Sequence, residues 1–141
     1  MASSDGLDGL MSAFDRVKKA PRQQITKALE ASANELADAQ QHLAPKDTHA
    51  LADSITVTGP GETTPAYSQP GGSRVAGETE VIVTAGDADV RYAHLVEYGT
   101  STTEAQPFFW PALRLLRKSL QQRIDRAGRK AVRDAWNGKN V

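Results

Sequence analysis

The chain has 141 residues, a length that predicts one domain around a single hydrophobic core. Its basic and acidic residues both number 17, so net charge indicates neither a polyanionic nor a polycationic partner. The absence of cysteine excludes disulfide bonds and thiolate chemistry. No signal peptide and no apolar run of about 18 residues is visible, so we expect a cytoplasmic protein, or part of an assembly built in the cytoplasm, with no membrane partner.

Basic residues are concentrated towards the C-terminus. From Leu113 onward, nine of the 17 Lys and Arg residues accompany only Asp125 and Asp134, a formal charge of +7 that the preceding residues balance with −7. Such a polarity is more typical of a part in an assembly, or of a polyanion contact, than of a free enzyme.

The N-terminal part predicts an arm followed by a long helix. Within residues 1–20, Leu7, Leu10, Met11 and Phe14 have helical spacing, which indicates a short helix or an arm that docks on a partner. Pro21 suits the first turn of the next helix, and Pro45 ends that helix. Charged and amide residues are expected on its outer face. The predicted buried face consists of Ile25, Leu29, Ser32, Ala33, Leu36 and Leu43.

The middle of the chain predicts a small sheet. Asp47 or Thr48 can cap a helical turn that ends at Leu51, and residues 55–58 and 80–84 have the alternating, β-branched pattern of strands. Between the strands, residues 59–78 hold three prolines and five glycines, which predicts a long, extended and mobile loop with Tyr67 as an anchor.

Two further segments complete the predicted fold. Residues 86–89 form a turn, and residues 90–98 form either a third strand or one helical turn that leads into a third strand. A second long helix occupies the last 30 or so residues and stops at Gly138. Its apolar face consists of Phe109, Leu113, Leu116, Leu120, Ile124, Ala127, Ala131 and Ala135. We therefore predict an α+β fold in which residues 21–141 form one domain, a small antiparallel β-sheet packed against a long N-terminal helix and a long basic C-terminal helix.

Few residues suggest chemistry. The histidines, His42, His49 and His94, lack the spacing of metal ligands, so we expect neither a metal nor another cofactor. Glu97 is the one acid in an apolar stretch, and with His94 it is the only candidate for a general base. We favour a structural role for Glu97, as a helix cap or as the partner of an arginine in the last helix, because an unpaired buried carboxylate is costly.

A row of basic residues marks one flank of the last helix. Arg114, Lys118, Arg129 and Arg133 follow helical steps, and Arg126 is grouped with them. Such a row can bind phosphates without sequence preference and with strong salt dependence. The alternatives are a solvated face and ion pairing with the acidic N-terminal part of a neighbouring subunit.

Two blocks of sequence resemble one protein family. The first reads Ala44-Pro-Lys-Asp-Thr-His-Ala-Leu-Ala-Asp-Ser-Ile55, similar to an Ala-Pro-x-Asp-Thr-Gly-x-Leu-x-x-Ser-Ile element. Its signature positions are Pro45, Asp47, Thr48, Leu51, Ser54 and Ile55. Those of the second block are Tyr92, Ala93, Val96, Glu97, Tyr98, Gly99, Thr100, Pro107, Phe108, Pro111, Ala112 and Leu113. Together the blocks resemble the tail-component, or tail-completion, proteins of long-tailed phages, typified by the gene-ten product of phage HK ninety-seven. His49 stands where that family has glycine, so if the glycine has positive φ, the turn differs here or is strained.

The resemblance implies a structural protein of the virion, without catalytic residues, at the head–tail junction. There it would form a ring, with six copies by analogy with tail symmetry, that completes or terminates the tail tube and joins it to the head connector. The ring would contact head-connector and tail-tube proteins, and its channel would allow sequence-independent contact with DNA. A head-closure or neck-collar role remains an alternative, as does a free DNA-binding protein. The arm 1–20 and the loop 59–78 are candidates for contacts between subunits and between rings.

The second block also predicts a packed corner. Gly99 permits a chain reversal, Pro107 and Pro111 set the direction of the last helix, and residues 101–106 form an exposed polar tip. Two aromatic and apolar sets are expected to pack on either side of the reversal. One set is Tyr92, Val96 and Tyr98, and the other is Phe108, Phe109 and Trp110.

Overall fold

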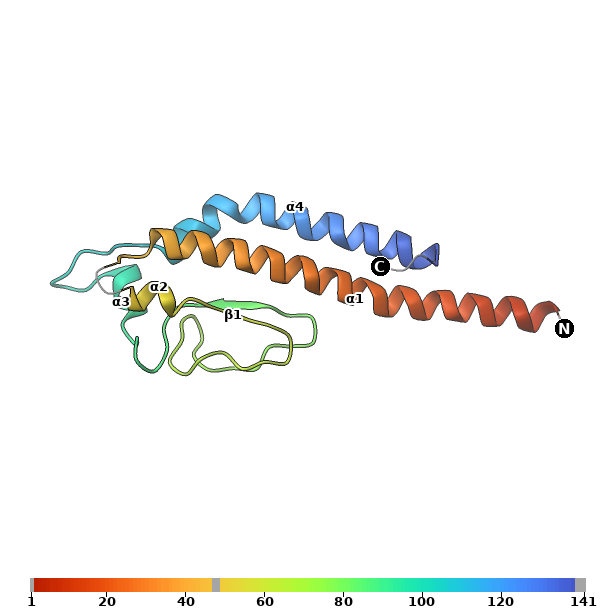
Figure 1. Ribbon diagram of the computed structural model, residues 1–141, viewed down its shortest axis with the longest axis horizontal. Coiled ribbons are helices and arrows are strands. Elements are labelled where there is room, and N and C mark those ends of the chain that lie inside the picture. The colour runs from red at the N-terminus through yellow and green to blue at the C-terminus, as the bar shows by residue number, and fades with distance from the viewer. Residues whose placement is uncertain (1, 47–48, 139–141) are drawn as a thin grey trace.

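Two long helices form the frame of the molecule, and a small sheet with short helices covers one side of it (Figure 1). The computed structural model describes residues 2–46 and 49–138, and for residues 2–8 and 13–21 it describes the backbone only. In chain order the elements are α1 (Ala2–Leu43), α2 (Ala50–Asp53), β1 (Thr56–Thr58), β2 (Ile82–Thr84), α3 (Ala93–Tyr98) and α4 (Phe109–Trp136). This is the predicted α+β architecture, with a two-stranded antiparallel sheet.

The helices α1 and α4 run antiparallel, side by side, as a hairpin (Figure 1). The predicted apolar face of α4 turns towards α1, and Leu120, Ala131 and Ala135 are buried there. The small side chains of Ala131 and Ala135 allow the two helix backbones to approach closely. At the edge of the interface, Nη2 of Arg123 lies 2.7 Å from Oε2 of Glu35 and ties the helices together.

The start of α1 differs from the prediction. The helix begins at Ala2 and runs through Pro21, and its N-terminal part extends beyond the end of α4 (Figure 1). A proline removes one intrahelical hydrogen bond at a cost of about 3 kcal/mol, which weakens a helix without obliging it to end. The other boundary is as predicted, because α1 ends at Leu43, before Pro45.

The buried face of α1 is also wider than predicted. Leu43, expected inside, is 49% exposed, whereas Gln40, expected outside with the other amides, is fully buried. The reason is that α1 packs against α4 on one side and against the sheet and α2 on another. A single apolar stripe along α1 cannot face both neighbours, so the helix also buries Ala37 and Ala44.

The strands β1 and β2 pair antiparallel with Thr56 opposite Thr84, Val57 opposite Val83 and Thr58 opposite Ile82. Each strand is shorter than predicted by one or two residues at its N-terminal end. The buried residues Ile82 and Thr84 alternate with the partly exposed Val83, as expected for a strand with one face in the core.

The loop between the strands is folded rather than extended. Isolated bridges join Thr63 to Val75 and Gln69 to Ala85, so the loop forms its own hairpin and returns to the end of β2. Tyr67 anchors it as predicted, because the guanidinium carbon of Arg91 lies 3.8 Å from the centre of the Tyr67 ring.

A carboxylate clamps the far end of this loop. Glu80 accepts hydrogen bonds from the N–H of Gly77 and from both terminal nitrogens of Arg74. The Gly77 N–H, and then Arg74, lower the pKa of Glu80 below its usual value.

Residues 93–98 form the helix α3, so the predicted helical turn is present, but no third strand follows it within the described residues and that part of the prediction is wrong. Ala93 is buried in the main core cluster, which also contains Leu51, Ile55, Val90 and Phe108. At the C-terminal end, α4 stops at Trp136, and Gly138 has a φ of 76°, in agreement with its predicted role as a helix stop.

The turn before α2 is strained, which is one of the two outcomes expected if the family's glycine has positive φ at this position. His49 is the N-cap of α2 and has a left-handed backbone, with φ at 61° and ψ at −3°. Such a conformation is costly for a residue with a Cβ atom and free of cost for the glycine that the family has there. Asp47 and Thr48, the predicted caps, lie outside the described residues.

We predict that His49→Gly raises the free energy of unfolding by about 1 kcal/mol, because glycine relieves the left-handed strain. The matched control is His42→Gly, which places the same substitution in the last turn of α1 and should destabilise the chain by about 0.5 kcal/mol. Urea titration of both variants measures the effect. Equal destabilisation by the two substitutions would contradict the assignment of strain to His49.

Candidate functional site

The carboxylate of Glu97 caps the N-terminus of α4. Its Oε1 accepts the backbone N–H of Phe108 at 2.9 Å and that of Phe109 at 2.8 Å, and its Oε2 accepts the N–H of Trp110 at 3.2 Å. Glu97 is only 7% exposed and comes from α3, eleven residues earlier in the chain. Of the two structural roles predicted for this residue, the helix cap is confirmed.

The cap satisfies the whole first turn of α4. A helix leaves the N–H groups of its N-cap and of its next three residues without intrahelical acceptors. In α4 these residues are Phe108, Phe109, Trp110 and Pro111. Glu97 accepts the first three N–H groups, and Pro111 has none to donate. A negative charge is also favourable at this end of the helix dipole.

A buried amide on α1 fixes the same turn. Nε2 of Gln40 donates to the carbonyl of Phe109 at 3.2 Å. The rings of Phe108 and Phe109 meet edge to face with centroids 6.4 Å apart, and those of Phe109 and Trp110 do so at 5.0 Å. Helix α4 is therefore held at its start by α1 and by α3 at once.

The chain reversal before α4 depends on Gly99, as predicted. Gly99 has a φ of 78°, and a Cβ atom there would lie 2.8 Å from the backbone nitrogen of Ala105. The polar tip that follows is tied back to α3, because the N–H of Gln106 donates to the carbonyl of Val96 at 2.8 Å. The residues 101–104 of the tip are exposed.

The packing predicted around the reversal is only half right. Phe108 and Phe109 are buried, but Tyr92 is 40% exposed and Tyr98 is 67% exposed. A tyrosine on a six-residue helix at the surface keeps its hydroxyl in reach of water or of a polar partner. For Tyr98 that partner is the indole of Trp110, whose Nε1 donates to the Tyr98 hydroxyl at 2.6 Å.

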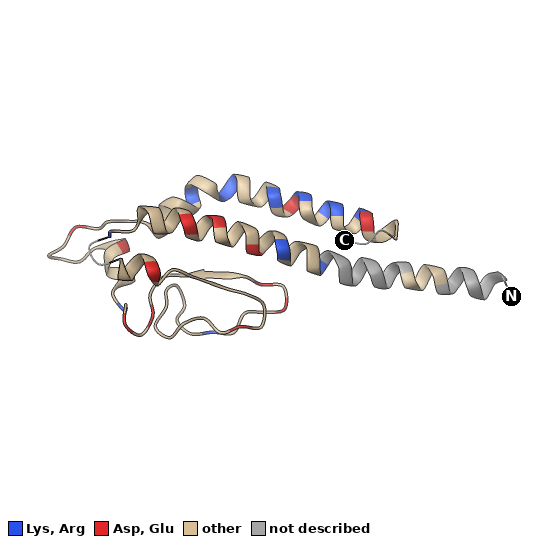
Figure 2. Ribbon diagram, in the orientation of Figure 1, with Lys and Arg blue, Asp and Glu red and all other residues tan. Residues whose placement is uncertain are grey.

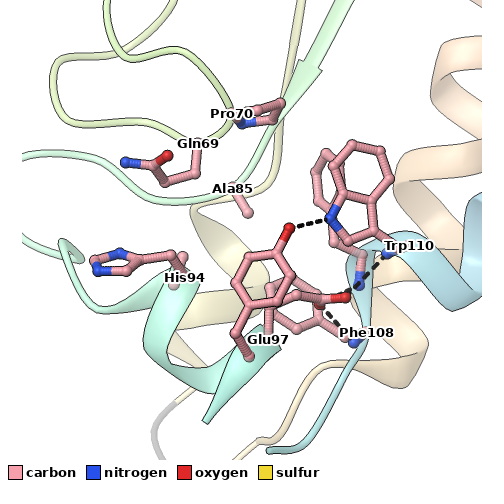
Figure 3. A pocket seen from close by; sticks show the side chains of 10 residues that line it. Gln69, Pro70, Ala85, His94, Glu97, Phe108 and Trp110 are labelled. Atoms are coloured by element: carbon pink, nitrogen blue, oxygen red, sulfur yellow. Dashed lines mark hydrogen bonds between the residues drawn. The ribbon is translucent and has the colours of Figure 1, made fainter. Parts of the chain in front are cut away.

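A small cavity lies beside this corner (Figure 3). Its volume is about 50 Å³, and its walls include Gln69 and Ala85 from the sheet side, His94 and Glu97 from α3, and Trp110 from α4. Ligand pockets usually measure about 300 Å³ or more, so a metabolite does not fit. Both oxygens of Glu97 are taken up by backbone N–H groups, which leaves the general-base hypothesis without support from the geometry.

The first signature block packs into the same core as the second. Leu51 and Ile55 belong to the cluster that contains Ala93, Phe108 and Phe109. The hydroxyl of Ser54 donates to the carbonyl of Leu51 at 2.6 Å and accepts the N–H of Gly86 at 3.0 Å, which links α2 to the turn after β2. Most signature residues within the described chain thus hold the corner together.

The remaining signature positions lie at the edges of the corner. Pro45 follows α1, Ala112 is fully buried, and Leu113 packs against the second apolar cluster with Leu36. Thr100 and Pro107 are exposed.

The basic row forms a separate surface. All five residues grouped in the row, Arg114, Lys118, Arg126, Arg129 and Arg133, are exposed. Their exposure places them on the side of α4 that does not pack on α1. Figure 2 shows mostly Lys and Arg among the charged residues of α4, whereas Asp and Glu are more frequent on the described part of α1 and in the layer beneath it. The corner and the basic row do not share a site.

Two kinds of site are missing from the part of the chain that the structure describes. Among the side chains that the structure describes, no group of three His, Asp or Glu residues could hold a metal ion. No described helix is both long and apolar enough to span a membrane.

Sequence reasoning missed Gln40 and Gly86. Gln40 sits in a polar stretch that looks solvent-facing, so only its spacing of four from Leu36 signalled a buried position. Gly86 has a φ of 97°, and a Cβ atom there would lie 2.8 Å from the carbonyl oxygen of Val90. The run Gly-Asp-Ala-Asp marks a turn but gives no sign of that close approach.

We predict that Glu97→Gln lowers the free energy of unfolding by about 1–3 kcal/mol, because the amide removes the charge and leaves one fewer acceptor for three N–H groups. Guanidinium titration followed by circular dichroism measures the loss. Glu104→Gln, an identical change in the exposed tip, is the control and should be neutral. A Glu97→Gln variant as stable as the parent chain would rule out the capping role.

Comparison with known proteins gives one result. Residues 8–99 match the family described as "Bacteriophage HK97-gp10, putative tail-component". The matched range contains the first signature block and the second as far as Gly99, and residues 100–113 lie beyond it. Comparisons with curated proteins and with solved structures find no match. Because the family match covers well over half of the chain, the protein belongs to the HK97-gp10-like family of phage tail components.

Proposed function

We propose that this chain is a ring-forming protein of the phage head–tail junction, where it completes or terminates the tail tube and joins it to the head connector. The family description, a tail component, is that of a structural part of the virion. The family description does not specify the head–tail junction or a ring of six copies, and both are part of the proposal. A non-enzymatic role fits Glu97, whose carboxylate serves as a helix cap.

The observation that carries the proposal is the segregation of charge on a stiff hairpin. In a ring, each copy meets its neighbour through two different faces, which must be complementary. The exposed side of α4 is mainly basic, with Arg114, Lys118 and Arg126, whereas the exposed side of α1 has mixed charge, with Glu30 and Asp38 beside Lys27 (Figure 2). One copy therefore offers a basic face, and a neighbouring copy can present the carboxylates of Glu30 and Asp38 to it.

Other parts of the surface suit contacts with neighbouring rings. The tip 101–106 and the loop 59–78 lie away from the α1–α4 interface (Figure 1). Both are held in shape by their own hydrogen bonds, so they can contact head-connector or tail-tube proteins with little loss of conformational entropy.

A second candidate function is sequence-independent DNA binding through the basic row. Every residue of that row is exposed, which favours DNA binding because phosphate contacts need accessible Lys and Arg side chains. The same row can line a channel through which DNA passes, so the two functions are compatible in a ring.

We expect purified virions to contain this chain as a ring at the head–tail junction, visible by electron microscopy of labelled particles. Particles made without the gene separate the roles within the junction. A terminator predicts tails of uncontrolled length that fail to join heads. A head-closure protein predicts heads that lose their DNA beside tails of normal length, and a collar protein predicts joined but fragile particles. Recovery of the chain from lysate and never from virions would exclude all three roles.

For the DNA-binding function, we expect the affinity of the chain for random duplex DNA to fall steeply with salt. Five phosphate contacts give a slope of about −4.5 for log K against log salt concentration. Lys118→Ala and Arg126→Ala should each reduce the slope by about 1, whereas Lys27→Ala on the exposed side of α1 should not change it. A slope that responds equally to all three substitutions would show that the basic row is not the DNA site.

A further inference from the structure

An apolar groove lies on the hairpin near the C-terminal end of α4. It is lined by Ile25 of α1 and by Gly128, Val132 and Trp136 of α4, with Arg129 and Arg133 along it, and its volume is about 590 Å³. Val132 is 45% exposed and Trp136 is 52% exposed. A contiguous apolar patch on the surface of a small chain marks a contact site more often than apolar residues exposed singly do.

The arm of α1 presents the complementary features. Residues 2–20 form the N-terminal part of α1, which extends beyond the end of α4, and within them Leu10 is 44% exposed and Met11 is 54% exposed (Figure 1). The arm belongs to one continuous helix with Ile25, so it cannot turn back into the groove of its own chain. An arm that fills this groove must come from another copy.

Charge and spacing match between the two elements. Asp8 and Asp15 are seven residues apart on the arm, and Arg126 and Arg133 are seven residues apart on α4. At 1.5 Å of rise per residue, both intervals measure about 10.5 Å. Two helices laid side by side can therefore bring the acidic positions of the arm into register with the basic positions of α4 while Leu10 and Met11 face the apolar groove.

We propose that the arm of one copy docks in the groove formed by Ile25, Gly128, Val132 and Trp136 of the next copy. The contact is heterologous, since an arm and a groove are different surfaces, and repetition of it links copies head to tail. The inference deepens the proposed ring function and rests on it for the closure of the ring. It attributes the contact between neighbouring copies to the burial of apolar side chains at the end of the hairpin. The equal spacing of the acidic and basic positions sets how the two helices are aligned along each other.

The chain has no cysteine, which makes disulfide trapping a clean test. Met11→Cys and Val132→Cys are prepared as two single variants of the full chain, mixed in equal amounts and mildly oxidised. Ile25 packs against Gly128, so positions 11 and 132 of one chain are about 15 Å apart along the hairpin. A disulfide requires Cα atoms within about 7 Å, so even in a chain that carries both cysteines the bond must join two copies. Intact mass spectrometry distinguishes the mixed dimer from the two homodimers, because the variants differ in mass.

We expect a mixed dimer in several-fold excess over a control mixture of Met11→Cys with Leu115→Cys. Leu115 is 79% exposed on α4 and lies outside the groove, so it reports random collision. Adding Asp8→Lys and Asp15→Lys to the Met11→Cys variant should bring the yield towards that of the control. A yield of the 11–132 dimer no greater than that of the 11–115 dimer would overturn the proposed contact.

The doubly substituted chain, Met11→Cys with Val132→Cys, separates this inference from the ring proposal. A ladder of cross-linked multimers supports head-to-tail linkage. If the mixed dimer forms but the double variant gives dimers alone, the arm contact stands and the proposed ring falls. If the 11–132 yield equals the control while sedimentation of the parent chain shows multimers, assembly stands and the arm contact is overturned.

Discussion

The capping of α4 by Glu97 is the interaction on which the rest of the structure depends. The start of this helix lies at the core, beside the fully buried Phe108, where the protein largely shields its backbone N–H groups from water. Each N–H left without an acceptor there would cost about 1–3 kcal/mol. One carboxylate accepts three of them, and Pro111 removes the fourth, so the helix can begin inside the protein.

The corner in turn sets the surface that the protein presents. With its first turn fixed by Glu97 and by Gln40, α4 leaves the core in one direction and packs along α1 through small residues. That packing turns Arg114, Lys118 and the other residues of the basic row outward on α4, whereas the exposed side of α1 carries both acidic and basic residues. A core contact thereby determines how charge is distributed over the molecule, and the distribution supports assembly with copies of itself or contact with DNA.

The sequence predicts the parts of the fold that depend on local patterns. The long helix from Phe109 onward, the two strands, the stop at Gly138 and the reversal at Gly99 all follow from periodicity or from residue types with few conformations. The structural role of Glu97 follows from the cost of burying a carboxylate, but its partners do not, because they are backbone groups eleven to thirteen residues away. Gln40 and Leu43 are misplaced in the prediction because α1 packs against two neighbours. The helical spacing of apolar residues in the sequence indicates one buried face and does not show a second. Pro21 misleads for a related reason, since a single missing hydrogen bond does not decide where a long helix begins.

Amide hydrogen exchange at Phe108, Phe109 and Trp110 tests the central claim most directly, because the first amides of a helix normally exchange quickly. The cap predicts that these three amides are protected nearly as well as those in the middle of α4, and that Glu97→Gln lowers this protection while the middle of α4 keeps most of its own. Fast exchange at all three positions in the parent chain would contradict the account.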